Sequence, residues 1–129
     1  MQRQNISSGA QWEDIVGYSR AVRIGNVIEV AGTTAVDEQN NVIGINSPGE
    51  QTRFILSKIE KALQSAGGRL ENVIRSRIFV TDISRWEEVG RAHGEFFRTI
   101  KPVATMVEVS KLISPELLVE IEVTAIVDP

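Results

Sequence analysis

The chain has 129 residues, of which 42% are hydrophobic and 24% are charged, and its formal net charge at pH 7 is −3. This length and composition are those of one globular domain with a modest core. The acidic balance gives no electrostatic basis for binding nucleic acid or an anionic membrane surface. The sequence contains no cysteine, which excludes disulfides, thiol catalysis and cysteine metal sites. Because Met1–Asn5 lacks the apolar core of a signal peptide and no segment reaches membrane-spanning length, we expect a cytoplasmic protein.

The N-terminal part of the chain predicts a hairpin. Residues 1–18 are polar and are expected to be irregular. Strands are expected over Ser19–Ile24 and Val27–Ala31, on either side of Gly25-Asn26. Both turn residues tolerate positive φ, which suits a tight connection between antiparallel strands.

A helix is predicted to begin at Ser47. Ser47 can cap the first turn, Pro48 suits the first helical position, and Glu50 completes a capping box. Apolar side chains then recur at helical spacing, at Phe54, Ile55, Ile59, Ala62, Leu63 and Ala66. Gly67-Gly68 provides the C-terminal stop.

The next elements are a strand over Val73–Val80 and a second helix. Ser84 with Glu87 repeats the capping-box pattern, and apolar side chains at helical spacing continue to about Ile100. Pro102 ends this helix, because the residue before a proline disfavours helical backbone.

The last quarter of the chain predicts two strands, Ala104–Val109 and Leu118–Ile126. Apolar and polar residues alternate strictly in the second strand, so Glu120, Glu122 and Thr124 share one face. Carboxylates at positions i and i+2 of a strand lie roughly 6.5–7 Å apart. Alternation alone favours a solvated outer face, and the alternative is that one glutamate lines a cleft.

The predicted order is β-β-α-β-α-β-β in one domain over residues 1–129, which is an α+β fold. Two amphipathic helices cover only one face of a mixed sheet of five or six strands, and the other face also carries apolar residues. The simplest partner for that face in a small domain is another copy of the chain.

Several short motifs follow one another in a specific order. In the last quarter they are Pro102, then Val107-Glu108-Val109, Leu112-Ile113-Ser114-Pro115 and Val119-Glu120-Ile121-Glu122. Upstream they are Gly17-Tyr18, Gly25-Asn26, Val27–Gly32, Ala66-Gly67-Gly68, Ile78–Asp82 and Glu95-Phe96-Phe97. This ordered set, spread over nearly the whole chain, resembles the Rid family (reactive intermediate deaminase, RidA/YjgF), also labelled L-PSP endoribonuclease-like.

The resemblance implies a chorismate-mutase-like fold and a homotrimer. In that family the sheets form a barrel-like core, and small-molecule ligands bind in clefts between subunits. No cofactor and no metal ion are implied. We therefore expect a small-molecule ligand and two further copies of this chain as partners, with no nucleic acid and no membrane.

The resemblance also assigns residues to the cleft. Glu120 matches the carboxylate that positions an attacking water, Tyr18 a pocket tyrosine, and Gly32 a glycine whose backbone approaches the ligand. Thr105 and Met106 follow the position of the family's substrate-binding arginine. The residues by themselves also allow Glu120 as an ion-pair partner, Tyr18 as a rim residue, Gly32 as a bend and Met106 as core filler.

One position departs from the family pattern. Deaminases of this family carry an arginine two residues after the proline of the C-terminal signature, where it holds the substrate carboxylate, and here that residue is Ala104. Arg20 or Arg77 can replace it if either reaches the cleft, because a guanidinium binds carboxylates through two parallel hydrogen bonds. The alternative is that both arginines pair with neighbouring glutamates.

The sequence thus favours a Rid-family small-molecule protein, and as an enzyme a hydrolase of enamines or imines with an altered substrate. The alternative is a trimeric, non-catalytic small-molecule-binding or interaction module. One histidine and an acidic balance give no basis for ribonuclease chemistry. That histidine, His93, has no spaced companion for a metal, and we expect it to pack between helix and sheet.

Overall fold

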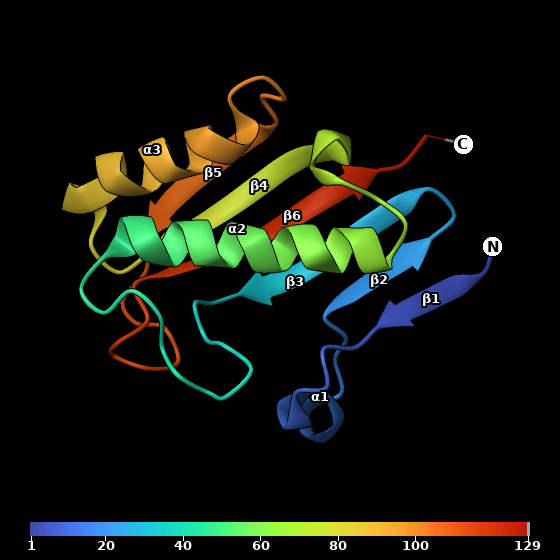
Figure 1. The fold of residues 1–129 in the computed structure, drawn as a ribbon, viewed down its shortest axis with the longest axis horizontal. Coiled ribbons are helices and arrows are strands. Elements are labelled where there is room, and N and C mark those ends of the chain that lie inside the picture. Colours follow the sequence, from blue (N-terminus) through green and yellow to red (C-terminus); the bar gives the residue numbers. More distant parts are fainter. Residues whose placement is uncertain (129) are drawn as a thin grey trace.

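The computed structural model describes residues 1–128 and has a six-stranded sheet with two long helices on one face (Figure 1). The strands are β1 (Arg3–Ile6), β2 (Ala21–Ile24), β3 (Val27–Thr33), β4 (Val73–Val80), β5 (Val103–Glu108) and β6 (Val119–Ile126). The helices are α1 (Gln11–Val16), α2 (Pro48–Ser65) and α3 (Trp86–Phe97), with short 3₁₀ turns η1 (Leu70–Asn72) and η2 (Ile83–Arg85). The expected α+β single-domain architecture is confirmed.

The sheet is mixed, and its strand order is β1-β2-β3-β6-β4-β5. Strands β4 and β5 pair in parallel, and the other neighbours pair antiparallel. The C-terminal strand β6 therefore lies in the middle of the sheet, between β3 and β4. Strand β5 is an edge strand that follows β4 through the α3 crossover, as a parallel pair requires.

The core lies between the sheet and α2. Alternate residues of β6 and the inner stripe of α2 are fully buried, which explains the strict alternation in the sequence. The largest of these buried side chains are Ile28, Ile55, Leu56, Ile59, Leu63, Val80, Val119, Ile121 and Val123. Each contributes roughly 1.5–3 kcal/mol on burial.

The ends of α2 follow the predicted chemistry. The Ser47 side chain accepts a hydrogen bond from the Glu50 backbone N–H, and Pro48 is the first helical residue. At the other end Gly67 has φ of 86°, a left-handed conformation that only glycine adopts without strain. The Gly25-Asn26 turn also forms as expected, with Ile24 opposite Val27.

Three local predictions are wrong. Residues 1–18 are not irregular throughout, because β1 adds to the sheet edge and α1 forms a short helix. Ser84 does not cap α3. It donates to the Asp82 carboxylate, whose side chain caps η2 instead, and α3 ends at Phe97 rather than near Ile100.

The face of the sheet away from α2 and α3 carries no helix except the short α1 at its margin (Figure 1). Exposed or half-buried side chains of β3, β4 and β6 cover it, among them Glu29, Arg77, Glu120 and Glu122. Within residues 1–128 no helix is both long and apolar enough to cross a lipid bilayer.

Candidate functional site

Gly32 and Glu120 lie against each other on two neighbouring central strands. The register of β3 with β6 shifts between Val30 and Thr33, so Gly32 sits at an irregularity of the ladder. A Cβ at Gly32 would overlap the Glu120 carboxylate and would lie 3.1 Å from its Cδ atom. The absence of a side chain at Gly32 therefore leaves the space in which the Glu120 carboxylate lies.

The Glu120 side chain is half-buried on the face of the sheet opposite α2. Burial raises its pKa, the nearby positive charge of Arg20 lowers it, and the negative charge of Glu122 raises it again, with burial the largest of the three effects. A carboxyl group with a raised pKa at a surface hollow is suited to exchanging a proton with a bound molecule or water.

Arg20 connects the glycine to the tyrosine. Its Nη2 donates to the Gly32 carbonyl over 2.7 Å, and its guanidinium carbon lies 5.9 Å from the centre of the Tyr18 ring. Tyr18 follows the left-handed C-cap of α1 at Gly17, and 38% of its surface is exposed. The structure therefore brings Tyr18, Arg20, Gly32 and Glu120 into one continuous set of contacts.

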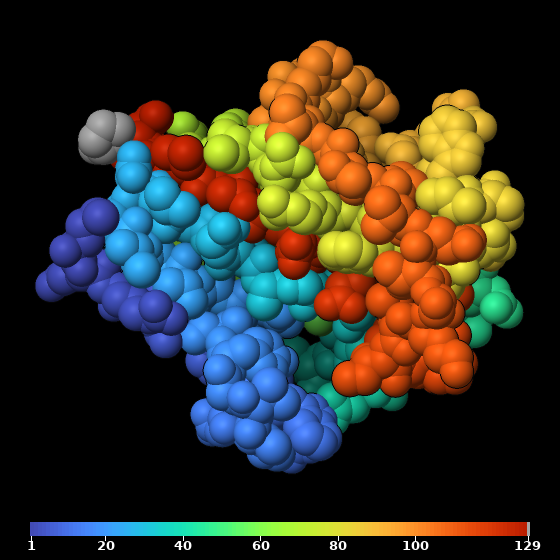
Figure 2. Space-filling model, turned by 180° about the vertical axis from the view of Figure 1, so that it is seen from behind, coloured from blue at the N-terminus to red at the C-terminus, as the bar shows by residue number. Residues whose placement is uncertain are grey.

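Figure 2 shows this face of the molecule, with a hollow between the N-terminal residues in blue, β6 in red and the loop before β6 in orange. The hollow lies at the end of the sheet where β6 begins and β3 ends. Its walls come from segments far apart in the sequence, which a fold with a central C-terminal strand brings together.

Arg77 occupies a different position. It lies opposite Glu122 in the β4–β6 register, and its Nη1 is 3.7 Å from a Glu122 carboxylate oxygen. Both side chains are about half exposed or less, at 47% and 37%. Arg77 is thus engaged as an ion-pair partner, which is the alternative that the sequence left open for it.

Ala104, Thr105 and Met106 lie on edge strand β5, away from Glu120 within one chain. Ala104 and Met106 are in register with the inward-facing Ser76 and Ile78 of β4, so they share the helix face of the sheet. Thr105 is in register with Arg77 and faces the other way. One chain therefore does not bring the Ala104 position and Glu120 together.

His93 forms a polar contact that the sequence did not reveal. Its Nε2 lies 2.9 Å from Oγ of the fully buried Ser76, and its ring centre is 4.7 Å from that of Phe97. Burial lowers the pKa of His93, which favours the neutral ring. His93 thus packs between α3 and β4, against Ser76, which is the register partner of Ala104 on β5.

Comparison with known proteins gives a consistent family. A profile described as Endoribonuclease L-PSP matches residues 9–127. The crystal structure of Rv2704 from Mycobacterium tuberculosis, a member of the YjgF/YER057c/UK114 family, is 52% identical, with a TM-score of 0.87 over 98% of this chain and 100% of that one. The Rid-family protein YyfA from Yersinia pestis is 27% identical, with a TM-score of 0.84 over 98% of this chain and 100% of that one.

A relative from Streptomyces coelicolor, SCO2049, is 36% identical over 95% of this chain and 90% of its own length. The profile covers strands β2 to β6 and both long helices. The profile and these relatives agree with the motif order in the sequence and with the strand order of the fold. The chain belongs to the Endoribonuclease L-PSP family, whose members include proteins described as YjgF/YER057c/UK114 and Rid proteins.

Proposed function

We propose that the hollow beside Glu120 binds a small molecule and that the chain hydrolyses an enamine or imine there. The observation that carries this proposal is the Gly32–Glu120 contact, because it places a half-buried carboxylate with a raised pKa beside a bare stretch of backbone. Family membership supports the reaction class, and the Tyr18–Arg20 pair supports a walled site.

The proposed step requires one base and one water. In imine hydrolysis the water oxygen bonds to the imine carbon, the carbon–nitrogen bond breaks, and ammonia leaves as the carbonyl forms. Glu120 would hold the water, accept its first proton as the carbon–oxygen bond forms and pass it to the nitrogen. It would then take the hydroxyl proton of the tetrahedral intermediate as the carbonyl forms and give it to the departing nitrogen, so that ammonia leaves. A carboxyl group whose pKa is raised can both accept a proton as a base and donate it again as an acid.

Ala104 determines whether a substrate carboxylate can be bound. Loss of a charge-assisted contact to a carboxylate removes about 1.5–3 kcal/mol, or roughly 10–150-fold in affinity. We therefore propose a substrate without a carboxylate at that point. Arg20 is the guanidinium beside Glu120, and it is the residue to test first if substrate carboxylates are nonetheless bound.

The proposed site is completed by neighbouring copies of the chain. Ala104 and Thr105 lie on an exposed edge strand, whereas Glu120 lies in the middle of the sheet. Trimer formation across the helix-free face would cover it and bring an edge strand of one subunit towards Glu120 of the next. Multi-angle light scattering of the purified protein tests this, with a mass near 43 kDa expected from about three times the 14.2 kDa chain.

The activity test compares four proteins on imines generated in situ by an amino acid oxidase or an amine oxidase. Wild type is expected to hydrolyse imines without a carboxylate. Glu120→Gln should lose at least about 100-fold in kcat/KM, the usual scale for removing a general base. Glu122→Gln is the matched control two residues away and should retain activity. Ala104→Arg should extend the activity to 2-imino acids.

The alternative is a non-catalytic binding module, and the missing guanidinium at Ala104 favours it. In that case the imines would raise the melting temperature of wild type and of Glu120→Gln alike, without turnover in either. Equal rates for wild type and Glu120→Gln on every imine would contradict the catalytic proposal.

A further inference from the structure

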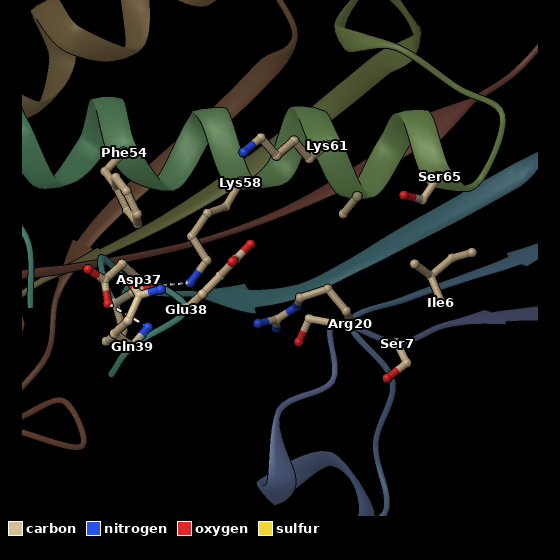
Figure 3. A pocket seen from close by; sticks show the side chains of 13 residues that line it. Ile6, Ser7, Arg20, Asp37, Glu38, Gln39, Phe54, Lys58, Lys61 and Ser65 are labelled. Atoms are coloured by element: carbon tan, nitrogen blue, oxygen red, sulfur yellow. Dashed lines mark hydrogen bonds between the residues drawn. The ribbon is translucent and has the colours of Figure 1, made fainter. Parts of the chain in front are cut away.

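A second concavity lies on the α2 side of the molecule, away from Glu120. It has a volume of about 390 Å³ and opens between α2, the end of β1 and the turn that follows β3 (Figure 3). Five residues of α2 line it at helical spacing, and they are Phe54, Lys58, Lys61, Ala62 and Ser65. The opposite wall comes from residues 6–8, Arg20 and residues 36–39. We call this concavity the α2 groove.

Three positive side chains line the α2 groove: Arg20, Lys58 and Lys61. Lys58 and Arg20 point into it from opposite walls, whereas Lys61 lies along α2 (Figure 3). None of the three takes part in an ion pair within residues 1–128. Lys58 Nζ donates to the backbone carbonyls of Thr34 and Val36, both over 2.9 Å. These two bonds hold the ammonium in place without neutralising its charge.

Arg20 is the least satisfied of the three. One of its terminal nitrogens donates to the Gly32 carbonyl, but its Nε is buried and has no hydrogen-bond partner within residues 1–128. A buried N–H without a partner is rare, because its desolvation is uncompensated. The hydrogen-bonding capacity of the Arg20 guanidinium is therefore only partly filled by the described residues.

Two acidic side chains also line the α2 groove, Asp37 and the exposed Glu38. Asp37 Oδ1 accepts the backbone N–H groups of Gln39 and Asn41, which fixes the turn after β3. Glu38 is the second acid of the lining. The lining itself carries three cations and two carboxylates, and the carboxylates of Glu13 and Glu120 act on Arg20 from outside the lining.

The uncharged part of the lining is half apolar and half polar, with Ser7, Ser8, Gln39 and Ser65 as its polar residues. Ile6, Val36, Phe54 and Ala62 contribute carbon surface, and Lys58 Nζ lies 5.9 Å from the centre of the Phe54 ring. A volume of about 390 Å³ falls within the range of small-ligand pockets, which combine an apolar wall with a few polar groups.

We propose that the α2 groove is a binding site for a small organic anion, a carboxylate or phosphate carried on an apolar body. Arg20 and the two lysines would bind the anionic oxygens through charge-assisted hydrogen bonds, and Phe54 with its apolar neighbours would pack on the body. The groove shares Arg20 with the Glu120 cleft, but its two lysines and Phe54 belong to α2, which lies on the face of the sheet opposite Glu120.

The ionisation of Lys58 agrees with this geometry. Burial and then the charge of Arg20 lower its pKa to about 8, while Asp37 acts in the other direction. The other charged groups lining the groove are Lys61 and Glu38. A bound anion adds negative charge next to Lys58 and restores its higher pKa, so binding near pH 8 should take up protons.

The experiment titrates the full chain with phenyl phosphate and with benzoate, using benzyl alcohol as the neutral analogue. Calorimetry in two buffers of different ionisation enthalpy at pH 8 gives the affinity and the proton uptake. The NMR signals of the Arg20 Nε–H group and of the Phe54 ring, which lines the groove on α2, together report where the probe binds. We expect binding of at least one anion, proton uptake, and a shift of the Arg20 signal. A preference between the two anions identifies the group that the site takes.

Lys61→Met should weaken binding at least about threefold, a cautious figure because the side chain is exposed. Lys111→Met, which removes an exposed lysine outside the groove, is the matched control and should not weaken it. Glu120→Gln should not weaken it either, and this separates the site from the cleft. Equal affinity for benzyl alcohol, an unmoved Arg20 signal, or equal losses in the two lysine variants would each overturn the proposal.

Discussion

Glu120 occupies the space that Gly32 leaves open, and the two residues come from strands that are 88 positions apart in sequence yet adjacent in the sheet. The contact joins the backbone of Gly32, which has no side chain, to the end of the flexible Glu120 side chain. It is therefore a contact that a single methyl group would change without disturbing the core.

Gly32→Ala is expected to shift the Glu120 carboxylate while leaving the fold intact. The Cβ would meet only the far end of the Glu120 side chain, so the loss of unfolding free energy should stay below about 1 kcal/mol, under the usual range for overpacked cores. Imine hydrolysis should fall nearly as far as in Glu120→Gln. Gly94→Ala is the control, since nothing lies within 4 Å of a Cβ there. A stable Gly32→Ala variant with full activity would contradict the role of this contact.

Glu120→Gln is expected to stabilise the protein at neutral pH. Burial raises the folded-state pKa of Glu120, so the folded chain holds its proton to higher pH than the unfolded chain does. The stability that this proton provides is present below the unfolded pKa near 4.5 and is lost as pH rises through the folded value. Glutamine keeps the neutral shape at every pH.

Thermal melts of Glu120→Gln and wild type from pH 4 to pH 8 test this. The difference in melting temperature should be small at pH 4 and should grow with pH in favour of Glu120→Gln. Glu122→Gln, which removes the exposed ion pair with Arg77, serves as the reference. A gap that shrinks as pH rises would show that the charged carboxylate is the form that the fold stabilises.

The Ser76–His93 contact should show strong coupling. His93→Phe leaves the buried Ser76 hydroxyl without its partner, which costs about 1–3 kcal/mol. Ser76→Ala similarly removes the partner of His93. The double variant should lose less than the sum of the single losses, as a double-mutant cycle by urea unfolding would measure.

The same histidine predicts an acid-side loss of stability. Burial lowers the folded-state pKa of His93 below its ordinary value of 6.5, so this contribution is present above about pH 6.5 and is lost as pH falls. In His93→Phe that part of the pH dependence should vanish. An unchanged slope below pH 6.5 would mean that the imidazole is not the group that titrates.

Gln51 should be essential for the segment that leads into β6. Its fully buried amide donates to the carbonyls of Gly44 and Glu116, and its oxygen accepts the Leu118 N–H. Gln51→Met keeps the size but leaves buried backbone groups unpaired, so we expect a loss of about 2–4 kcal/mol in urea unfolding. Gln64→Met, on the exposed surface of the same helix, should change stability by less than about 0.5 kcal/mol.

The sequence predicted those parts of the fold whose local chemistry and burial agree. The bounds of β4 were correct, and the Gly25-Asn26 turn and the Ser47 cap form where local propensity and tertiary structure agree. The failures lie where signals are weak. Strand β1 lies at an exposed edge of the sheet, and its residues do not alternate between apolar and polar. Before α3, two nearby polar residues, Asp82 and Ser84, could each act as a cap.

Part of the candidate site could be predicted from the sequence, because its residues belong to the ordered motifs. The order of the motifs predicted Tyr18, Gly32 and Glu120 as cleft residues. It did not predict which face of β5 carries Ala104, because that depends on the parallel register of β5 with β4. The α2 groove had no sequence signal, because Lys58 and Lys61 resemble the solvated positions of any amphipathic helix. Whether Arg20 or Arg77 approaches Glu120 likewise depended on side-chain reach, which strand position alone does not give.

Arg20 also links the two faces of the sheet energetically. Its charge lowers the pKa of Lys58 on the α2 side and the pKa of Glu120 on the other. An anion that neutralised Arg20 in the groove would therefore raise the pKa of Glu120. Because thermodynamic coupling is reciprocal, ionisation of Glu120 would lower the affinity of the groove for the anion by an equal factor. Through the Arg20 guanidinium, the ionisation of Glu120 on one face of the sheet would respond to anion binding in the α2 groove on the other face, with no change of backbone conformation.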